Sequence, residues 1–189
     1  MVDDGDVLDL LARGDERRAL TALMARYGVP VYRFCRQMLR DEVLADDVHQ
    51  QVFVQAFRDL PRFERRSALQ TWLFGIARHR CLDAIKIEGR RGRRFPLEDE
   101  PGDGDATGGP SVLDRMAAAE VAGALEHCLD ELAPATKSAV LLRFREGLGF
   151  EEMAAMHDEK AGTLQARVAR ALPVLRKCLE RRLKDAEAA

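Results

Sequence analysis

The sequence predicts an all-α protein made of two small helical domains joined by a linker. Charged residues make up 33% of the 189 residues and aromatic residues only 6%, a balance that suits exposed helices better than sheets. On both sides of a Pro- and Gly-rich stretch, apolar residues recur at three- and four-residue steps, which is the period of an amphipathic helix. The hydrophobic content of 47% is enough to bury a core in one domain or in two.

The linker is the stretch PLEDEPGDGDATGGPS, residues 96 to 111. It combines Pro, Gly and acidic residues with almost no apolar side chains, so burial cannot offset the entropy of ordering it. The predicted organisation is a disordered N-terminus at 1–6, a first domain at 7–95, a flexible acidic linker at 96–118, a second domain at 119–184 and a tail at 185–189.

Charge is distributed unevenly along the chain. The formal net charge of −2 argues against a globally basic nucleic-acid-binding protein, but a binding surface needs only local positive charge. Bases dominate from residue 78 to 94, opposed only by Asp83 and Glu88, and again from 160 to 184, where Glu180 is the only acid. These two segments are therefore candidate nucleic-acid contacts.

The four cysteines are scattered singly, without the paired spacing of a zinc site or a redox motif. We expect ordinary buried or half-buried thiols, no metal and no cofactor.

No charged leader followed by an apolar run opens the chain, and no apolar stretch approaches the ~20 residues that cross a bilayer. The expected location is the cytoplasm, without insertion into a membrane.

Two apolar stripes predict helices in the first domain. The first begins after two acids, which favour a helix start, and consists of Val48, Val52, Ala56, Phe57 and Leu60. The second consists of Leu69, Trp72, Leu73, Ile76, Ala77, Cys81 and Ile85. With the second stripe inward, His79, Asp83 and Lys86 fall at i, i+4 and i+7 and share a different face.

The second domain has the outline of a helix-turn-helix. Residues 150–172, FEEMAAMHDEKAGTLQARVARAL, predict a short helix, a polar turn and a longer helix. Pro173 has no amide hydrogen, so we expect a kink in the longer helix there. The predicted buried stripe of this helix consists of Leu164, Val168, Leu172, Leu175 and Leu179.

The opposite face of the longer helix is the predicted DNA contact. Its candidate residues are Thr163, Gln165, Ala166, Arg167 and Arg170. Unpaired amides at the helix start favour a phosphate, and the N-terminal part of such a helix enters the major groove, where Arg and Gln pair with base edges. An isolated Arg pair would indicate only a solvated surface, but the preceding helix, the turn and the local positive charge together favour DNA.

With these motifs the chain resembles the sigma-70 family of bacterial sigma factors, specifically the extracytoplasmic function (ECF) group. ADDVHQQVFVQAFRDLPRF resembles region 2.2, and ALQTWLFGIARHRCLDAIK resembles regions 2.3 and 2.4. LDELAPATKSAVLLRFREGLGFEEMAAMH followed by AGTLQARVARAL resembles region 4. The likeness implies a region 2 helical bundle, a region 4 helix-turn-helix domain that reads the −35 element, and a function in directing core RNA polymerase to promoters and opening them.

The resemblance also implies two sets of site residues in the first domain. The residues implied to dock on the clamp coiled coil of the polymerase β′ subunit are Asp46, Asp47, Gln50 and Gln51. The family usually has Glu in place of Gln51. Phe53 and Trp72 are expected to pack between helices. The residues implied to recognise the −10 element and to bind the melted strand are His79, Asp83, Lys86, Arg90 and Arg91. His79 replaces a common Asn and cannot reproduce the paired donor and acceptor of an amide, so the −10 preference stays open.

The implied partners are core RNA polymerase, through its β′ clamp helices and β flap, promoter DNA and a cognate anti-sigma factor. The acidic linker could mimic nucleic acid in a polymerase channel or be a plain solvated tether.

The main alternative function is a free-standing helix-turn-helix regulator, which would not need the first domain. An enzyme is disfavoured because the four histidines show no HExxH spacing and no nucleophile elbow occurs.

Overall fold

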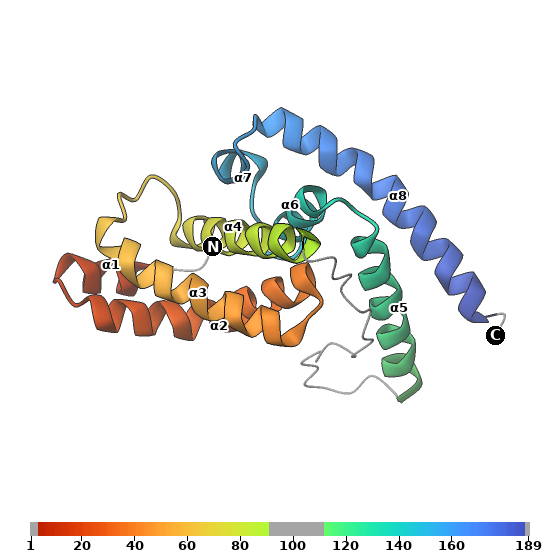
Figure 1. The fold of residues 1–189 in the computed structure, drawn as a ribbon, viewed down its shortest axis with the longest axis horizontal. Helices are drawn as coiled ribbons and strands as arrows, with labels where there is room; N and C mark the ends of the chain where they lie inside the picture. The colour runs from red at the N-terminus through yellow and green to blue at the C-terminus, as the bar shows by residue number, and fades with distance from the viewer. Residues whose placement is uncertain (1–3, 91–111, 188–189) are drawn as a thin grey trace.

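The computed structural model describes residues 4–90 and 112–187, and all regular structure in these two ranges is helical, which confirms the all-α class (Figure 1). The N-terminal bundle comprises α1 (Gly5–Ala12), α2 (Glu16–Leu39), α3 (Glu42–Asp59), the 3-10 helix η1 (Leu60–Arg62) and α4 (Leu69–Arg90). The C-terminal half comprises α5 (Val112–Asp130), α6 (Pro134–Phe144), α7 (Phe150–His157) and α8 (Ala161–Glu187).

The long helices of the bundle begin at aspartate caps. The Asp15 carboxylate accepts the backbone N–H of Arg18 at 3.2 Å, and the Asp41 carboxylate accepts that of Leu44 at 2.8 Å. Each bond satisfies one of the amides that a helix start leaves unpaired. Between the two helices Arg40 adopts a left-handed conformation, with φ 56°, and turns the chain so that α3 packs against α2.

The N-terminal boundary differs from the prediction. Residues 1–6 were expected to lack structure, yet α1 begins at Gly5. The Asp4 carboxylate accepts hydrogen bonds from Arg26 at 3.1 Å and from the Tyr27 hydroxyl at 2.8 Å. These contacts hold the start of α1 against α2. The composition of this N-terminal segment alone gives little reason to expect an ordered structure.

The boundary of the C-terminal half also differs. α5 begins at Val112, inside the predicted linker at 96–118. The Ala-rich run from 116 to 119 has a high helix propensity, which the linker assignment overlooked. The predictions for residues 91–111 lie outside the described residues.

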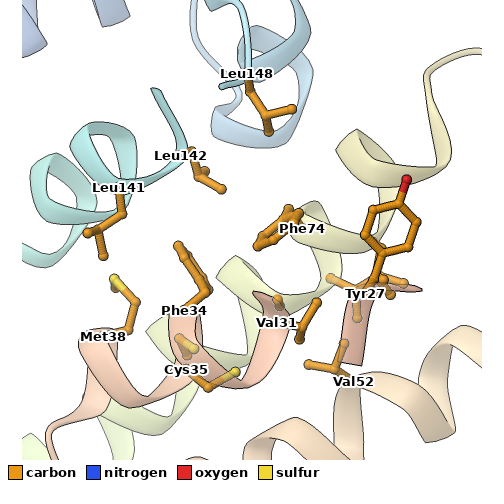
Figure 2. Packing of buried hydrophobic residues seen from close by; sticks show 14 of the residues in the cluster. Tyr27, Val31, Phe34, Cys35, Met38, Val52, Phe74, Leu141, Leu142 and Leu148 are labelled. Atoms are coloured by element: carbon orange, nitrogen blue, oxygen red, sulfur yellow. The ribbon is translucent and has the colours of Figure 1, made fainter. Parts of the chain in front are cut away.

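One hydrophobic core joins the bundle to the C-terminal half (Figure 2). Phe34 of α2 and Phe74 of α4 meet edge to face, with ring centroids 5.7 Å apart. Figure 2 shows Leu142 of α6 and Leu148 of the following loop on the same cluster, and both side chains are buried. Burying a large aliphatic or aromatic side chain contributes about 1.5–3 kcal/mol, so this shared core holds the two halves together.

The predicted apolar stripes are largely buried, with two errors. Phe57 is 41% exposed and Leu172 is 43% exposed, although both were assigned to the core. The buried residues of α8 are Leu164, Val168, Ala171, Leu175 and Cys178, which follow alternating steps of four and three. Ala171 therefore takes the inward position that the prediction gave to Leu172. α8 continues through Pro173 as one helix from Ala161 to Glu187 (Figure 1), and the kink expected there stays a prediction.

The cysteine prediction is wrong for one pair. Cys128 of α5 and Cys178 of α8 form a disulfide, with their Cα atoms 5.8 Å apart. They are separated by 50 residues, so no local spacing could indicate the pair, and only the packing of α5 along α8 brings them together. Cys35 and Cys81 are free thiols, both buried, as expected.

Candidate nucleic-acid and polymerase interfaces

The helix-turn-helix consists of α7, a short turn and α8. The Glu152 carboxylate accepts the backbone N–H of Gly149 at 2.7 Å and caps the start of α7. Asp158 ends this helix in a left-handed conformation, with φ 52°, and α8 begins at Ala161 after a turn of polar residues. The sequence therefore predicted the motif and its order correctly.

The outward face of α8 carries the residues predicted to contact DNA. Its exposed members are Thr163, Gln165, Ala166 and Arg170. Arg167 lies at the edge of this face, half-buried, and its Nη2 donates to the Glu159 carboxylate at 2.6 Å. The structure thus brings all five residues to the N-terminal half of one helix, but one of them is already paired within the protein.

A second face with positive charge lies along α4. His79 is exposed, and its Nε2 is 3.2 Å from a carboxylate oxygen of Asp83, so the acid orients the imidazole. Lys86 and Arg90 are also exposed on this helix, whereas Arg91 lies outside the described residues. The expected sharing of one face by His79 and Asp83 agrees with this geometry.

The segment between α3 and α4 adds basic residues that were not predicted as site residues. Arg62, Arg65 and Arg66 are exposed, and Phe63 packs against Trp72 of α4 with ring centroids 5.3 Å apart. The aromatic contact holds this basic segment beside the N-terminal end of α4. The run of three arginines within five residues was the signal that could have indicated it.

The outer face of α3 is acidic and polar. The predicted docking residues Asp46, Asp47, Gln50 and Gln51 are all exposed. The same helix exposes Val43, at 74%, and Val54, at 51%, which follow the spacing of Asp47 and Gln50 along one side. Both valines therefore lie on the face that carries the predicted docking residues. The sequence reasoning missed the two valines, whose helical spacing could have indicated them.

Polar contacts join the bundle to the C-terminal half. The Arg40 guanidinium lies 2.6 Å from the Glu126 carboxylate and 3.0 Å from that of Asp130, both on α5. Asp130 also accepts a hydrogen bond from the buried Lys137 ammonium at 2.5 Å. On the other side, Gln70 of α4 donates to the backbone carbonyl of Glu146 at 3.0 Å.

Arg78 of α4 reaches the helix-turn-helix directly. Its Nη1 donates to the backbone carbonyl of Met156 at 2.8 Å, and its charge faces Arg167 and Glu159. His157 is buried at this contact, and neither ring nitrogen has a hydrogen-bond partner. Buried donors and acceptors without partners cost free energy, so the burial of His157 destabilises this contact. Sequence reasoning placed Arg78 only in a basic run and could not assign it this contact.

Two titratable groups at the contact have shifted pKa values. Burial raises the pKa of Glu146 to about 7, against the lowering effect of Arg145 and Arg33. Burial, together with Arg78 and Arg167, lowers the pKa of His157 to about 3. Folding therefore favours a protonated Glu146 and a neutral His157.

The two groups give opposite pH dependences, which single substitutions should separate. Glu146 makes the folded protein less stable as pH rises from its ordinary value near 4.5 to about 7, and His157 makes it less stable as pH falls from 6.5 to about 3. Between these limits the effects largely cancel. We expect Glu146→Gln to remove the first effect, so that its free energy of unfolding rises relative to the parent protein by up to about 1.4 kcal/mol per pH unit between pH 5 and 7.

Urea unfolding at pH 5, 6 and 7 measures this difference. Glu151→Gln, which changes an exposed carboxylate on α7, is the matched control. Identical pH profiles for the two variants would contradict the assignment to Glu146.

Within the ranges 4–90 and 112–187, no group of three or more His, Cys, Asp or Glu side chains is arranged to hold a metal ion. Among the helices of the same residues, none combines the length and apolar character required to cross a membrane.

Comparisons with known proteins agree with this geometry. Residues 23–91 match the family Sigma-70 region 2, and residues 122–172 match Sigma-70, region 4. The ECF RNA polymerase sigma factor SigC of Mycobacterium tuberculosis is 33% identical over 173 residues, which cover 89% of this chain and 87% of that protein. The ECF RNA polymerase sigma-E factor of Escherichia coli is 27% identical over 175 residues, covering 89% and 90%.

Two solved structures share the fold. One is the sigma factor RpoE in complex with the anti-sigma factor NepR from Bartonella quintana, with a TM-score of 0.67, 22% identity and coverage of 85% of this chain and 96% of that one. The other is CnrH in complex with the cytosolic domain of CnrY, with a TM-score of 0.64, 23% identity and coverage of 94% and 97%. With the two matched regions in this order and a relative above 30% identity along most of the chain, the protein belongs to the ECF group of the sigma-70 family and is an RNA polymerase sigma factor.

Proposed function

We propose that this sigma factor joins core RNA polymerase through α3 and places α8 and α4 on two elements of the same promoter. The observation that carries the proposal is the N-terminal half of α8, which follows a complete helix-turn-helix and exposes a glutamine and an arginine, Gln165 and Arg170. These are side-chain types that pair with base edges in the major groove.

The C-terminal half reads the −35 element in this proposal. Gln165, Arg167 and Arg170 face the bases and phosphates, and Ala166 allows close approach to the groove. Thr163 lies in the first turn of α8, where the amides and the positive end of the helix dipole favour a phosphate. Arg167 must leave or share its contact with Glu159 when it binds DNA.

The face of α4 recognises the −10 element and holds the melted strand. His79, oriented by Asp83, stacks on or donates to a base, and Lys86, Arg90 and Arg91 contact phosphates. Arg62, Arg65 and Arg66 extend this positive surface beyond the start of α4. Strand capture and polymerase contacts supply the free energy for melting.

The α3 face docks on the β′ clamp helices, and the C-terminal half contacts the β flap. Polar contacts come from Asp46, Asp47, Gln50 and Gln51. Apolar surface that becomes buried on binding comes from Val43 and Val54. The extents proposed for region 2 and region 4 are 7–95 and 119–184. The protein acts in the cytoplasm as a binding subunit and not as an enzyme.

An anti-sigma factor is the proposed regulator. In one solved structure that shares this fold, the sigma factor RpoE is in complex with the anti-sigma factor NepR, and in another CnrH is in complex with the cytosolic domain of CnrY. Such a partner would keep the α3 face from core polymerase.

In-vitro transcription tests the proposed function. Core RNA polymerase is supplied with a fragment library from the source genome, with and without this protein. Discrete start sites that depend on the protein support the proposal, and their upstream sequences give the −35 and −10 preferences. Binding to duplex DNA without any directed start would instead indicate a free-standing regulator.

Charge reversal on α3 should impair assembly with core. We expect Asp47→Arg to weaken core binding at least about tenfold, because it places a positive charge where the surface of core polymerase is complementary to a negative one. Binding to duplex DNA should be unchanged. Fluorescence anisotropy with purified core measures the affinity. Asp9→Arg, the same reversal at an exposed position of α1, is the control, and equal core affinities for the two variants would remove α3 from the docking surface.

A further inference from the structure

One face of α4 holds the helix-turn-helix against the bundle. The Arg78 guanidinium donates to the backbone carbonyl of Met156 at 2.8 Å, and the Thr71 hydroxyl donates to the Glu152 carboxylate at 3.4 Å. Between these bonds the two helices approach closely at Gly75, where a Cβ atom would lie 3.6 Å from the Cβ of Met156. α7 therefore lies directly on α4.

The same contact brings together the two helices that are proposed to read DNA. His79 directly follows Arg78, and the −10 surface continues from there to Arg90 over about 18 Å at 1.5 Å per residue. α8 begins four residues after the end of α7, and its reading segment from Ala161 to Arg170 extends over about 14 Å. Both reading segments thus start beside one contact.

A promoter places its two elements much farther apart than this. The positions −35 and −10 differ by about 25 base pairs, which is about 85 Å along B-DNA at 3.4 Å per base pair. The two reading segments together extend over only about 32 Å. They cannot lie on both elements of an unbent duplex while α7 stays on α4.

The contact also withholds one of the residues predicted to read DNA. Arg167 donates through Nη2 to the Glu159 carboxylate at 2.6 Å, and its Nη1 is buried without a hydrogen-bond partner among the described residues. Its charge is close enough to His157 to lower, together with Arg78, the pKa of that imidazole. The Arg167 guanidinium therefore faces the contact with α4, whereas Arg170 on the same helix is exposed.

We propose that the contact between α4 and α7 is autoinhibitory: it holds the protein in a closed state that cannot engage both promoter elements, and promoter recognition requires the two halves to separate. This inference rests on the functions proposed for α4 and α8. The docking residues of α3, among them Asp46 and Asp47, are exposed in the closed state, so closure leaves the surface for core polymerase accessible.

A reversible cross-link between the two helices tests the inference. The Cβ separation of 3.6 Å between positions 75 and 156 falls in the range of about 3.5–4.5 Å that disulfides need, so Gly75→Cys with Met156→Cys should lock the closed state. The assay is initiation by holoenzyme, assembled from core polymerase and the full-length protein, on a promoter fragment that the parent holoenzyme has selected. We expect the oxidised double variant to initiate at least about tenfold more slowly than its reduced form, because it loses the contacts with one element and each good base contact contributes about 1–3 kcal/mol.

The single variants Gly75→Cys and Met156→Cys are the matched controls. Neither forms the cross-link, so both should initiate like the parent protein with and without reductant. The parent protein under the same two conditions corrects for reduction of the native disulfide between Cys128 and Cys178. Non-reducing electrophoresis measures the cross-linked fraction of the free double variant under mild oxidation.

A bulky side chain at position 75 should have the opposite effect on the free protein. Gly75→Ala adds only a Cβ atom in ordinary contact with Met156, so it should keep the closed state. Gly75→Phe adds a ring beyond that atom, which should push α7 away from α4 and release Arg167. We expect free Gly75→Phe to bind a duplex with the −35 element about fivefold or more tightly than free Gly75→Ala, as for one recovered base contact, when measured by fluorescence anisotropy.

Three results would overturn the inference. The first is initiation by the oxidised, cross-linked protein at the rate of its reduced form. The second is equal affinity of Gly75→Phe and Gly75→Ala for the −35 duplex, and the third is a free double variant that does not form the cross-link. Failure of the proposed function gives a different result, since the parent protein and the reduced double variant would then both fail to direct core polymerase to discrete start sites.

Discussion

Replacing Arg167 and Arg170 together by alanine is expected to lower −35-dependent initiation by about 30-fold or more, because each good contact with a base contributes about 1–3 kcal/mol of discrimination. The two side chains lie on the N-terminal half of α8, away from the α3 face. Core binding should therefore stay unchanged. Abortive-initiation rates on promoters with intact and scrambled −35 elements measure the loss, and anisotropy with core measures assembly.

Arg176→Ala is the matched control for this double variant. Arg176 is exposed on the same helix, but it lies beyond the first turns of α8 and pairs with Glu180 at 2.8 Å. We expect initiation close to that of the parent protein. Loss of core binding in the double variant would show that α8 takes part in assembly, which contradicts its assignment as a DNA-reading helix.

Replacing Arg40 by alanine is expected to separate the C-terminal half from the bundle. Arg40 is 11% exposed at its side chain and is the cation that faces both Glu126 and Asp130 across the contact. Removing one partner of a buried ion pair costs about 3–5 kcal/mol, since a charge that loses its only partner stays buried without compensation. Lys137 still pairs with Asp130 but cannot replace Arg40 at both acids.

Small-angle scattering and hydrogen exchange measure this separation. The radius of gyration should rise, and the amides of α6 should exchange faster, while the helices of the bundle stay protected. Arg36→Ala is the control, because Arg36 lies one turn earlier on α2 and pairs more loosely with Glu42, at 3.8 Å. Identical scattering curves for Arg40→Ala and the parent protein would mean that the apolar core alone holds the two halves together.

The features that the sequence predicted well depend on residues close together along the chain. The helix-turn-helix follows from the turn residues around Asp158 and the apolar spacing of α8. The exposure of Asp46 and Asp47 follows from the stripe beside them on α3. Such signals repeat every few residues, so each segment carries its own information.

Several of the errors depend on contacts between distant segments. Leu172 was placed in the core because an ideal helical period was assumed, whereas packing against other helices selected Ala171. The disulfide between Cys128 and Cys178 and the contact of Arg78 with Met156 join residues that no local pattern relates. For the same reason the shifted pKa values of Glu146 and His157 could not be foreseen, since each arises from burial against another element.

The sequence by itself determined the helices, the polar turn before α8 and the side chains that α8 and α3 present to partners, because periodicity and turn chemistry act over a few residues. The tertiary structure alone decided that the two halves share one core, that Arg78 and Arg40 connect them, and that Glu159 holds Arg167. These features follow from packing, which brings together residues far apart in the chain and makes burial and charge neighbours properties of the whole fold.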